Sequence, residues 1–239
     1  MSVDMQQVWV YLSTSPLLWL TLTLIAYQIG TWIFSRLDFH PVLNPVLTAI
    51  ILLVVLLKVS GIDYQTYFKG AQFIHFLLGP ATVALAIPLH RELEIIRKSF
   101  VPIIVTLAAG SLAAIASAVG IVWALGGESV LLLTVAPKSV TTPIAMGISE
   151  QIGGLPSLTA VVVVLTGITG AVGGDFVLNR LRINDDKARG MALGVASHGV
   201  GTAHAIQRSR VAGAFSALAM ALNGLFTALL LPALVRLLQ

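Results

Sequence analysis

The feature that most constrains this chain is a series of long apolar stretches, separated by short loops that carry most of the charge. A helix that crosses the hydrocarbon core of a bilayer needs about 20 mostly apolar residues. Only 10% of the residues are charged, a share far below the rough quarter found in ordinary soluble domains. The sequence therefore predicts an all-α, polytopic membrane helical bundle. The five stretches expected to form its apolar helices are Pro16 to Phe34, Asn44 to Val59, Phe100 to Leu125, Leu158 to Leu178 and Ala212 to Leu237.

Three further segments have the length of a helix but carry Pro, Gly, Ser, Thr or His near their middle. They are Gln72 to Leu89, Val130 to Ile148 and Gly190 to Ile206. Each contains the same pattern of five consecutive residues: a small residue, a helix breaker, a variable residue, a second small residue and Val. This similarity predicts repeated units, each made of a broken segment and a long helix. Chance similarity among Ala-, Gly- and Val-rich segments is the alternative. We expect one transmembrane domain over residues 1–239, with N-terminal helices in 1–70 and repeat units in 71–239.

The distribution of positive charge favours broken segments that enter the membrane and return on the same side. Short loops rich in Lys and Arg face the cytoplasm in most membrane proteins. If the segment around Lys138 is re-entrant, all the basic loops lie on one side, whereas a crossing segment would place the loop after Leu178 outside. Two such segments that enter from opposite faces would meet near the midplane, as in the inverted repeats of many transporters. The basic loops are those at Arg36, at Arg91, Arg97 and Lys98, at Arg180, Arg182, Lys187 and Arg189, and at Arg208 and Arg210.

A lysine lies in the middle of the second broken segment, with prolines on both sides. Pro137 and Pro143 remove helical hydrogen bonds and predict an unwound backbone around Lys138, Ser139, Thr141 and Thr142. A lysine at the bilayer centre costs roughly 2.5–3.5 kcal/mol, which an anionic ligand would offset. Lys138 could instead extend to the membrane interface, or pair with a carboxylate such as Glu150 or Asp175. The sequence favours a role in substrate binding.

Within the third broken segment, the stretch from Gly194 to Ala205 contains Ser197, His198 and Thr202 among glycines. These side chains could bind a carboxylate, and His198 could carry a proton. A histidine bonded to a neighbouring carbonyl group is an equally good interpretation. The residues expected to break helices are Pro80, Pro137, Pro143, Gly199 and Gly201.

Other polar residues have simpler interpretations. Asn44 is predicted to cap a helix, Asn223 to make contacts between helices, and Asp175 to lie at the membrane interface. Met1 to Ser15 has no Lys or Arg and no small-residue cleavage site, so the first apolar stretch is expected to be retained.

Several classes of function are disfavoured. The chain has no cysteine, which excludes disulfides, cysteine metal sites and thiol catalysis. No hydrolase, metalloprotease or nucleotide-binding motif occurs, so we expect neither an enzyme nor a cofactor nor a bound metal. The net charge of +4 resides in short loops and does not indicate nucleic-acid binding.

The string from Pro137 to Ala145 resembles the signature of the LrgB family, also called CidB-like. Further matches are spread from the second apolar helix to the last: Asn44-Pro45, Pro80 to Ala86, Ile152 to Pro156, Lys187 to Gly190, Ala196 to Gly199, Gly201 to Ala203 and Gly213 to Ser216. The chain departs from the family at His90, where Tyr is frequent, and at His204, where Arg is frequent. If that Arg holds a carboxylate, substrate choice differs in this chain.

The resemblance implies a bacterial inner-membrane protein that works beside a small holin-like protein of the LrgA/CidA type. The family includes proteins described as antiholin-like regulators of murein hydrolase export, a plastid glycolate/glycerate translocator and relatives linked to pyruvate uptake. Residues and resemblance together predict a secondary transporter of small monocarboxylates, as a homo-oligomer and with protons as a candidate coupling ion. Lys138, Ser139, Thr141, Thr142, Ser197, His198 and Thr202 would bind the substrate. The alternative is an antiholin-like regulator of autolysis.

Overall fold

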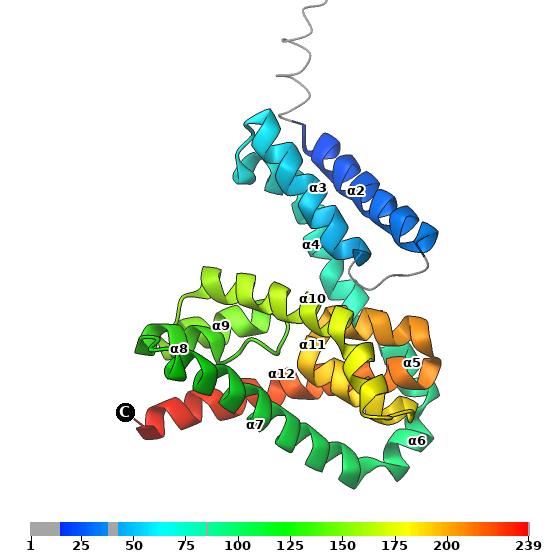
Figure 1. Ribbon diagram of the computed structural model, residues 1–239, viewed down its shortest axis with the longest axis vertical. Coiled ribbons are helices and arrows are strands. Elements are labelled where there is room, and N and C mark those ends of the chain that lie inside the picture. Colours follow the sequence, from blue (N-terminus) through cyan, green and yellow to red (C-terminus); the bar gives the residue numbers. More distant parts are fainter. Residues whose placement is uncertain (1–14, 38–42, 85, 239) are drawn as a thin grey trace, which may run out of the picture. The chain divides into compact units, whose positions relative to one another are not determined.

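The computed structural model describes residues 15–37, 43–84 and 86–238, which form helices and no strand (Figure 1). The chain divides into two compact units, residues 1–84 and 85–239. The expectation about Met1 to Ser15 falls almost wholly on residues outside the described ranges. All five apolar stretches form helices, and four of these helices have the length and hydropathy to cross a membrane. The predicted all-α polytopic membrane bundle is confirmed.

The first unit contains α2 (Pro16–Arg36), α3 (Pro45–Ser60) and α4 (Tyr64–Ala84). Helix α2 packs against both others, and Trp19 of α2 is fully buried edge-on to Tyr67 of α4. Asn44 caps α3 as predicted, because its side-chain oxygen accepts hydrogen bonds from the first-turn amides. Asp63 begins α4 in the same way. Hydrogen bonds from the Thr66 hydroxyl and amide hold the pKa of Asp63 below its usual value.

Pro80 does not end a helix in this unit. Helix α4 continues through Pro80 to Ala84, although the sequence predicts a break there. A single proline removes one backbone hydrogen bond and can bend a helix without terminating it.

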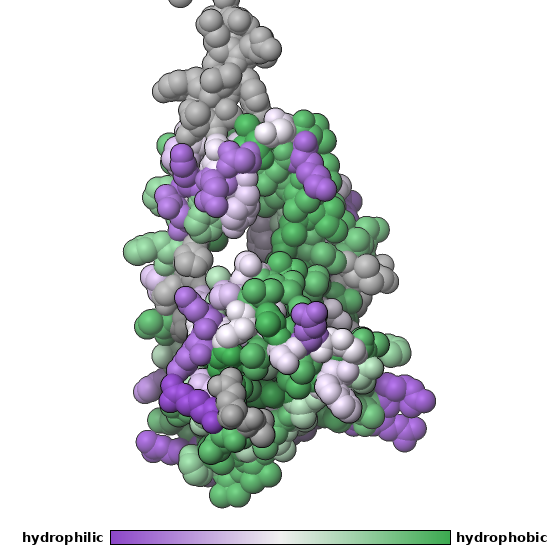
Figure 2. Space-filling model, turned by 90° about the vertical axis from the view of Figure 1, so that its left-hand side faces the viewer, coloured by the Kyte–Doolittle hydropathy of each residue, from purple (hydrophilic) through white to green (hydrophobic). Residues whose placement is uncertain are grey.

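The second unit is built around three long helices, α7 (Phe100–Ala124), α10 (Pro156–Arg180) and α12 (Arg210–Leu238). Two short helices, α5 (Ala86–Arg91) and α6 (Leu93–Lys98), precede them. Helix α10 has 25 residues and is therefore about 37 Å long, enough to span the hydrocarbon core. Apolar side chains also cover much of the surface shown in Figure 2, as expected for a surface that contacts lipid.

Helices α8 (Ser129–Val135) and α9 (Thr142–Ile152) form a hairpin with an unwound link at residues 136–141. We call α8, this link and α9 the first hairpin. The amide of Leu155 donates to the Thr134 hydroxyl at 2.9 Å, and Thr159 donates to the carbonyl oxygen of Thr134 and the hydroxyl of Ser149. The end of α9 and the start of α10 thus return to α8. The first hairpin therefore folds back on itself and does not form one continuous helix (Figure 1). Pro137 lies in the link and Pro143 in the first turn of α9.

Helix α11 (Asp186–Arg208) also folds back on itself, and we call it the second hairpin. His198 has φ 40° and ψ −126°, a non-helical conformation that divides α11 into two arms. Arg208, at the end of the second arm, pairs with Asp186 at the start of the first at 3.1 Å. Because an unbroken helix would hold these residues about 33 Å apart, the arms run side by side. Gly201 permits this approach, since a Cβ there would lie 2.5 Å from the Leu193 carbonyl oxygen.

The two hairpins enter the second unit from opposite ends of α10. The first hairpin is bonded to Leu155 and Thr159 at the start of α10, and the second to Asp175 and Asn179 near its end. Their tips meet near the middle of the helix, because His198 contacts Val163 and Lys138 shares a pocket with Thr166 and Gly170. This arrangement is the one predicted from the positions of the basic loops.

Candidate functional site

The unwound link of the first hairpin holds Lys138 near the middle of α10. Local hydrogen bonds shape the link, from Lys138 N to the carbonyl oxygen of Val135 (3.1 Å) and from Val140 N to that of Pro137 (3.2 Å). The Lys138 ammonium is half-buried and donates to the Ser139 hydroxyl at 3.2 Å. The cation therefore lies beside the middle of a helix that is long and apolar enough to cross a membrane.

Lys138 has no carboxylate partner among the described residues. None of the ion pairs between described residues includes it. Glu150 is exposed on α9, and Asp175 pairs with Arg189 and contacts His204. The counter-ions that the sequence offered as an alternative are therefore not in contact with this lysine.

A pocket of about 400 Å³ opens beside Lys138. It combines one cation, two hydroxyls from α10 and an otherwise apolar wall. Sequence reasoning missed Thr166 and Thr169, although their spacing of three residues in an apolar helix places them on one face. The lining residues are Lys138, Val162, Leu165, Thr166, Thr169, Gly170 and Ala196.

A second pocket of about 330 Å³ shares Thr169, Gly170 and Ala196 with the first and is also lined by Ser197. Ser197 is fully buried, and its hydroxyl has no hydrogen-bond partner among the described residues. Gly170 allows this hydroxyl to approach α10, since a Cβ there would lie 1.7 Å from it. An unpaired buried hydroxyl is uncommon in a folded protein, so Ser197 marks a polar position in an otherwise apolar junction of α10 and α11.

The other predicted site residues lie near these pockets with different roles. His198 is buried, and its Nε2 lies 3.0 Å from the Val163 carbonyl oxygen. Thr202 is buried and bonded to the His198 carbonyl oxygen and the Ser216 hydroxyl. Thr141 and Thr142 are half-buried at the start of α9, where the first-turn amides have no acceptor within the helix. Gly199 and Gly201 keep helical geometry beside the break, which lies at His198.

Asn223 of α12 joins the two tips, a contact more specific than the one predicted. Its amide nitrogen donates to the carbonyl oxygens of Ser139 (3.0 Å) and Val195 (3.3 Å), and its oxygen accepts from Ser111 of α7. A lone Asn in an apolar helix was the only signal in the sequence, and it does not identify its partners.

Asp175 of α10 binds both arms of the second hairpin. Arg189 of the first arm is 1% exposed and donates to Asp175, Asn179 and the Ile183 carbonyl oxygen. His204 of the second arm lies 2.6 Å from the other Asp175 oxygen. Among the described residues, no cluster of three or more His, Asp or Glu could hold a metal ion.

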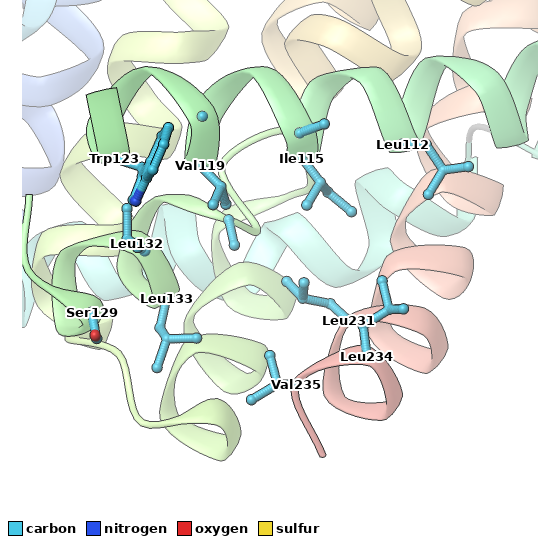
Figure 3. A pocket seen from close by; sticks show the side chains of 13 residues that line it. Leu112, Ile115, Val119, Trp123, Ser129, Leu132, Leu133, Leu231, Leu234 and Val235 are labelled. Atoms are coloured by element: carbon cyan, nitrogen blue, oxygen red, sulfur yellow. The ribbon is translucent and has the colours of Figure 1, made fainter. Parts of the chain in front are cut away.

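A larger pocket of about 760 Å³ lies between α7, α8 and α12 (Figure 3). Its labelled side chains include Trp123, Leu132 and Leu231, and Ser129 at one edge is the only polar one among them. This pocket lacks charge and is unsuited to a small anion.

The comparisons with known proteins agree with this architecture. The chain is 39% identical to the uncharacterized protein YwbG of Bacillus subtilis over 208 residues, which cover 87% of this chain and 92% of that protein. It is 39% identical to YxaC of the same organism, over 84% of this chain and 87% of YxaC. It is 31% identical to the antiholin-like protein LrgB of Bacillus cereus, over 91% of this chain and 95% of that protein. No solved structure matches the chain.

The model of the LrgB-like family matches residues 23–237, a range that includes both hairpins and Asn223. With the four helices that can cross a bilayer, this match identifies a membrane protein. The chain belongs to the LrgB-like family.

Proposed function

We propose that this protein is a secondary transporter of small monocarboxylates of the pyruvate, glycolate or glycerate type, and not an enzyme. The observation that carries the proposal is the Lys138 ammonium, which lines a pocket near the middle of α10 without a carboxylate partner among the described residues. A cation in a region of low dielectric constant is costly unless an anion accompanies it. A small acid would supply that anion.

The pocket supports a small polar ligand in three ways. The ammonium provides the charge, the hydroxyls of Thr166 and Thr169 provide neutral hydrogen-bonding groups, and the apolar side chains around them exclude water from the ion pair. At about 400 Å³ the pocket suits a molecule of a few heavy atoms.

The two hairpins support transport over static binding. Unwound backbone at membrane depth is tolerated where it is buried in protein or lines a wet cavity. Two broken segments that enter from opposite sides and meet near the midplane are a recurring plan among secondary transporters, with the substrate at their junction. Location in a bacterial inner membrane, a homo-oligomeric state and proton coupling through His198 remain predictions.

The test is uptake of radiolabelled pyruvate, glycolate or glycerate into liposomes that contain the purified protein. We expect the wild type to accumulate at least one acid, and Lys138→Ala to lose uptake because the binding charge is gone. Lys98→Ala is the matched control, since Lys98 is an exposed cation paired with Glu94 on α6. Equal uptake by Lys138→Ala and the wild type would overturn the site assignment.

The names of the relatives favour a second candidate, an antiholin-like regulator that acts with an LrgA-type membrane protein. Such a regulator would need a partner surface and no substrate. It predicts a stable complex with a co-expressed LrgA-type protein and an effect on autolysis that Lys138→Ala leaves intact. Absence of uptake for every small acid, together with such a complex, would establish this candidate over the transporter.

A further inference from the structure

One buried amide connects both hairpins to α7 and α12. Asn223 is 1% exposed, and its amide nitrogen donates to the carbonyl oxygens of Ser139 and Val195. Ser139 belongs to the link of the first hairpin, and Val195 to the first arm of the second. The Asn223 side-chain oxygen accepts from the Ser111 hydroxyl. Both donors and the oxygen of the amide are thus engaged with three separate segments.

These carbonyl groups need a partner because the chain is unwound near them. A helix leaves its last four carbonyl groups without intrahelical partners, and Val195 is among the last four residues before the break at His198. Ser139 lies in the non-helical link, where no helical partner exists. Asn223 therefore supplies to both tips the hydrogen bonds that their breaks remove.

Asn223 is connected to Lys138 through Ser139. Asn223 holds the Ser139 backbone, and the Ser139 hydroxyl accepts from the Lys138 ammonium at 3.2 Å. A shift of either tip away from the other breaks at least one of the two bonds to Asn223. We propose that Asn223 is a positioning residue that holds the Lys138 link and the α11 break as one unit. This inference rests on the proposed function only for its effect on uptake.

The structural test is hydrogen–deuterium exchange of the full-length protein in lipid nanodiscs. Asn223→Leu keeps the approximate volume and removes all three hydrogen bonds. We expect exchange to accelerate by about tenfold in both residues 136–141 and residues 195–201, because both tips lose the same partner. Thr227→Val is the matched control, since Thr227 is buried on α12 one turn further along. It should leave exchange at both tips unchanged.

A second variant keeps the inference testable if Asn223→Leu does not fold. Ser111→Ala removes only the support of the Asn223 oxygen and should produce a smaller acceleration at both tips. Acceleration at one tip alone, at neither tip, or equally in Thr227→Val would overturn the inference.

The uptake assay separates this inference from the proposed function. With Asn223→Leu we expect the apparent KM for the transported acid to rise by about tenfold with little change in maximal rate, because the displaced cation weakens substrate binding. If the wild type takes up no small acid, the proposed function fails, while the exchange experiment still decides the role of Asn223. If the wild type takes up an acid but the exchange data show that Asn223 does not hold both tips, the inference fails and the proposed transport function is unaffected.

Discussion

Ser197 is a residue at which stability and the proposed binding role make opposite demands. Its hydroxyl is buried without a partner among the described residues, and such a group costs about 1–3 kcal/mol of stability. We expect Ser197→Ala to leave the free energy of unfolding unchanged or to raise it by about 1 kcal/mol. We also expect it to weaken binding of the acid. Thermal unfolding and equilibrium binding of the purified protein measure the two effects.

Thr202→Val is the comparison for this prediction, because Thr202 is also buried but has partners in Ser216 and His198. It should lower the free energy of unfolding by about 1 kcal/mol. If Ser197→Ala destabilised the protein as much as Thr202→Val, the Ser197 hydroxyl would have a structural partner and no role for a ligand.

For single residues, sequence analysis identified polar side chains that are unusual in their apolar or glycine-rich surroundings. Lys138 stood out because a charge inside an apolar run must be compensated, and Ser197 because it lies among glycines. Asn223 and Asp175 were assigned only general roles, since an isolated polar residue can meet any of several neighbours. Their partners lie up to 112 residues away, and the local pattern carries no information about them.

The second hairpin depends on Asp175, which binds one residue in each arm. We expect Asp175→Asn to lower the free energy of unfolding by about 2 kcal/mol, because Arg189 is left buried with an uncompensated charge. This is less than the roughly 3–5 kcal/mol of a fully buried pair, since Asp175 is partly exposed. Denaturant unfolding in detergent micelles would measure the change.

Asp186→Asn provides the control at the open end of the same hairpin. Asp186 pairs with Arg208, and both side chains are 36% exposed, so the loss should stay below about 1 kcal/mol. A larger loss from Asp186→Asn than from Asp175→Asn would show that the surface pair, and not Asp175, holds the two arms together.

The helices were predictable to within a few residues because apolar length and proline position determine them locally. Helix α8 ends just before Pro137, and α9 begins with Pro143 in its first turn, as proline geometry requires. The break in α11 was predicted near glycines, yet the left-handed residue is His198. There, the His198 ring contacts the Val163 carbonyl oxygen of α10 and the His198 carbonyl oxygen accepts from Thr202 of the second arm, contacts that the propensity of Gly199 does not predict.

The second unit as a whole has a predicted orientation in the membrane. The loop after α7 lacks Lys and Arg, whereas four cations lie in or next to the loop between α10 and α11: Arg180, Arg182, Lys187 and Arg189. The chain has no cysteine, so a thiol reagent labels only a cysteine that is introduced by substitution. We expect an impermeant maleimide to label Glu128→Cys on intact cells, and Asn184→Cys only after permeabilisation. Both positions are exposed.

Labelling of both variants on intact cells would place the two loops on one side and contradict the opposite entry of the hairpins. Labelling of Asn184→Cys alone would invert the orientation and leave the architecture intact. The basic loops favour re-entrant segments, and the contacts within each hairpin show that both segments fold back, while the side of the membrane that each loop faces stays a prediction.

The shortness of α8 and α9 has a consequence for how the protein is made. With 7 and 11 residues, these helices reach only about 10 and 16 Å, too little for either to be released into lipid as a span while the ribosome is still translating. The amide that completes their link is on α12, which follows both hairpins in the chain. A nascent chain that has not yet reached Asn223 can bond the first hairpin to α10 but lacks the hydrogen bond to Ser139, so the link is completed only after α12 has been made.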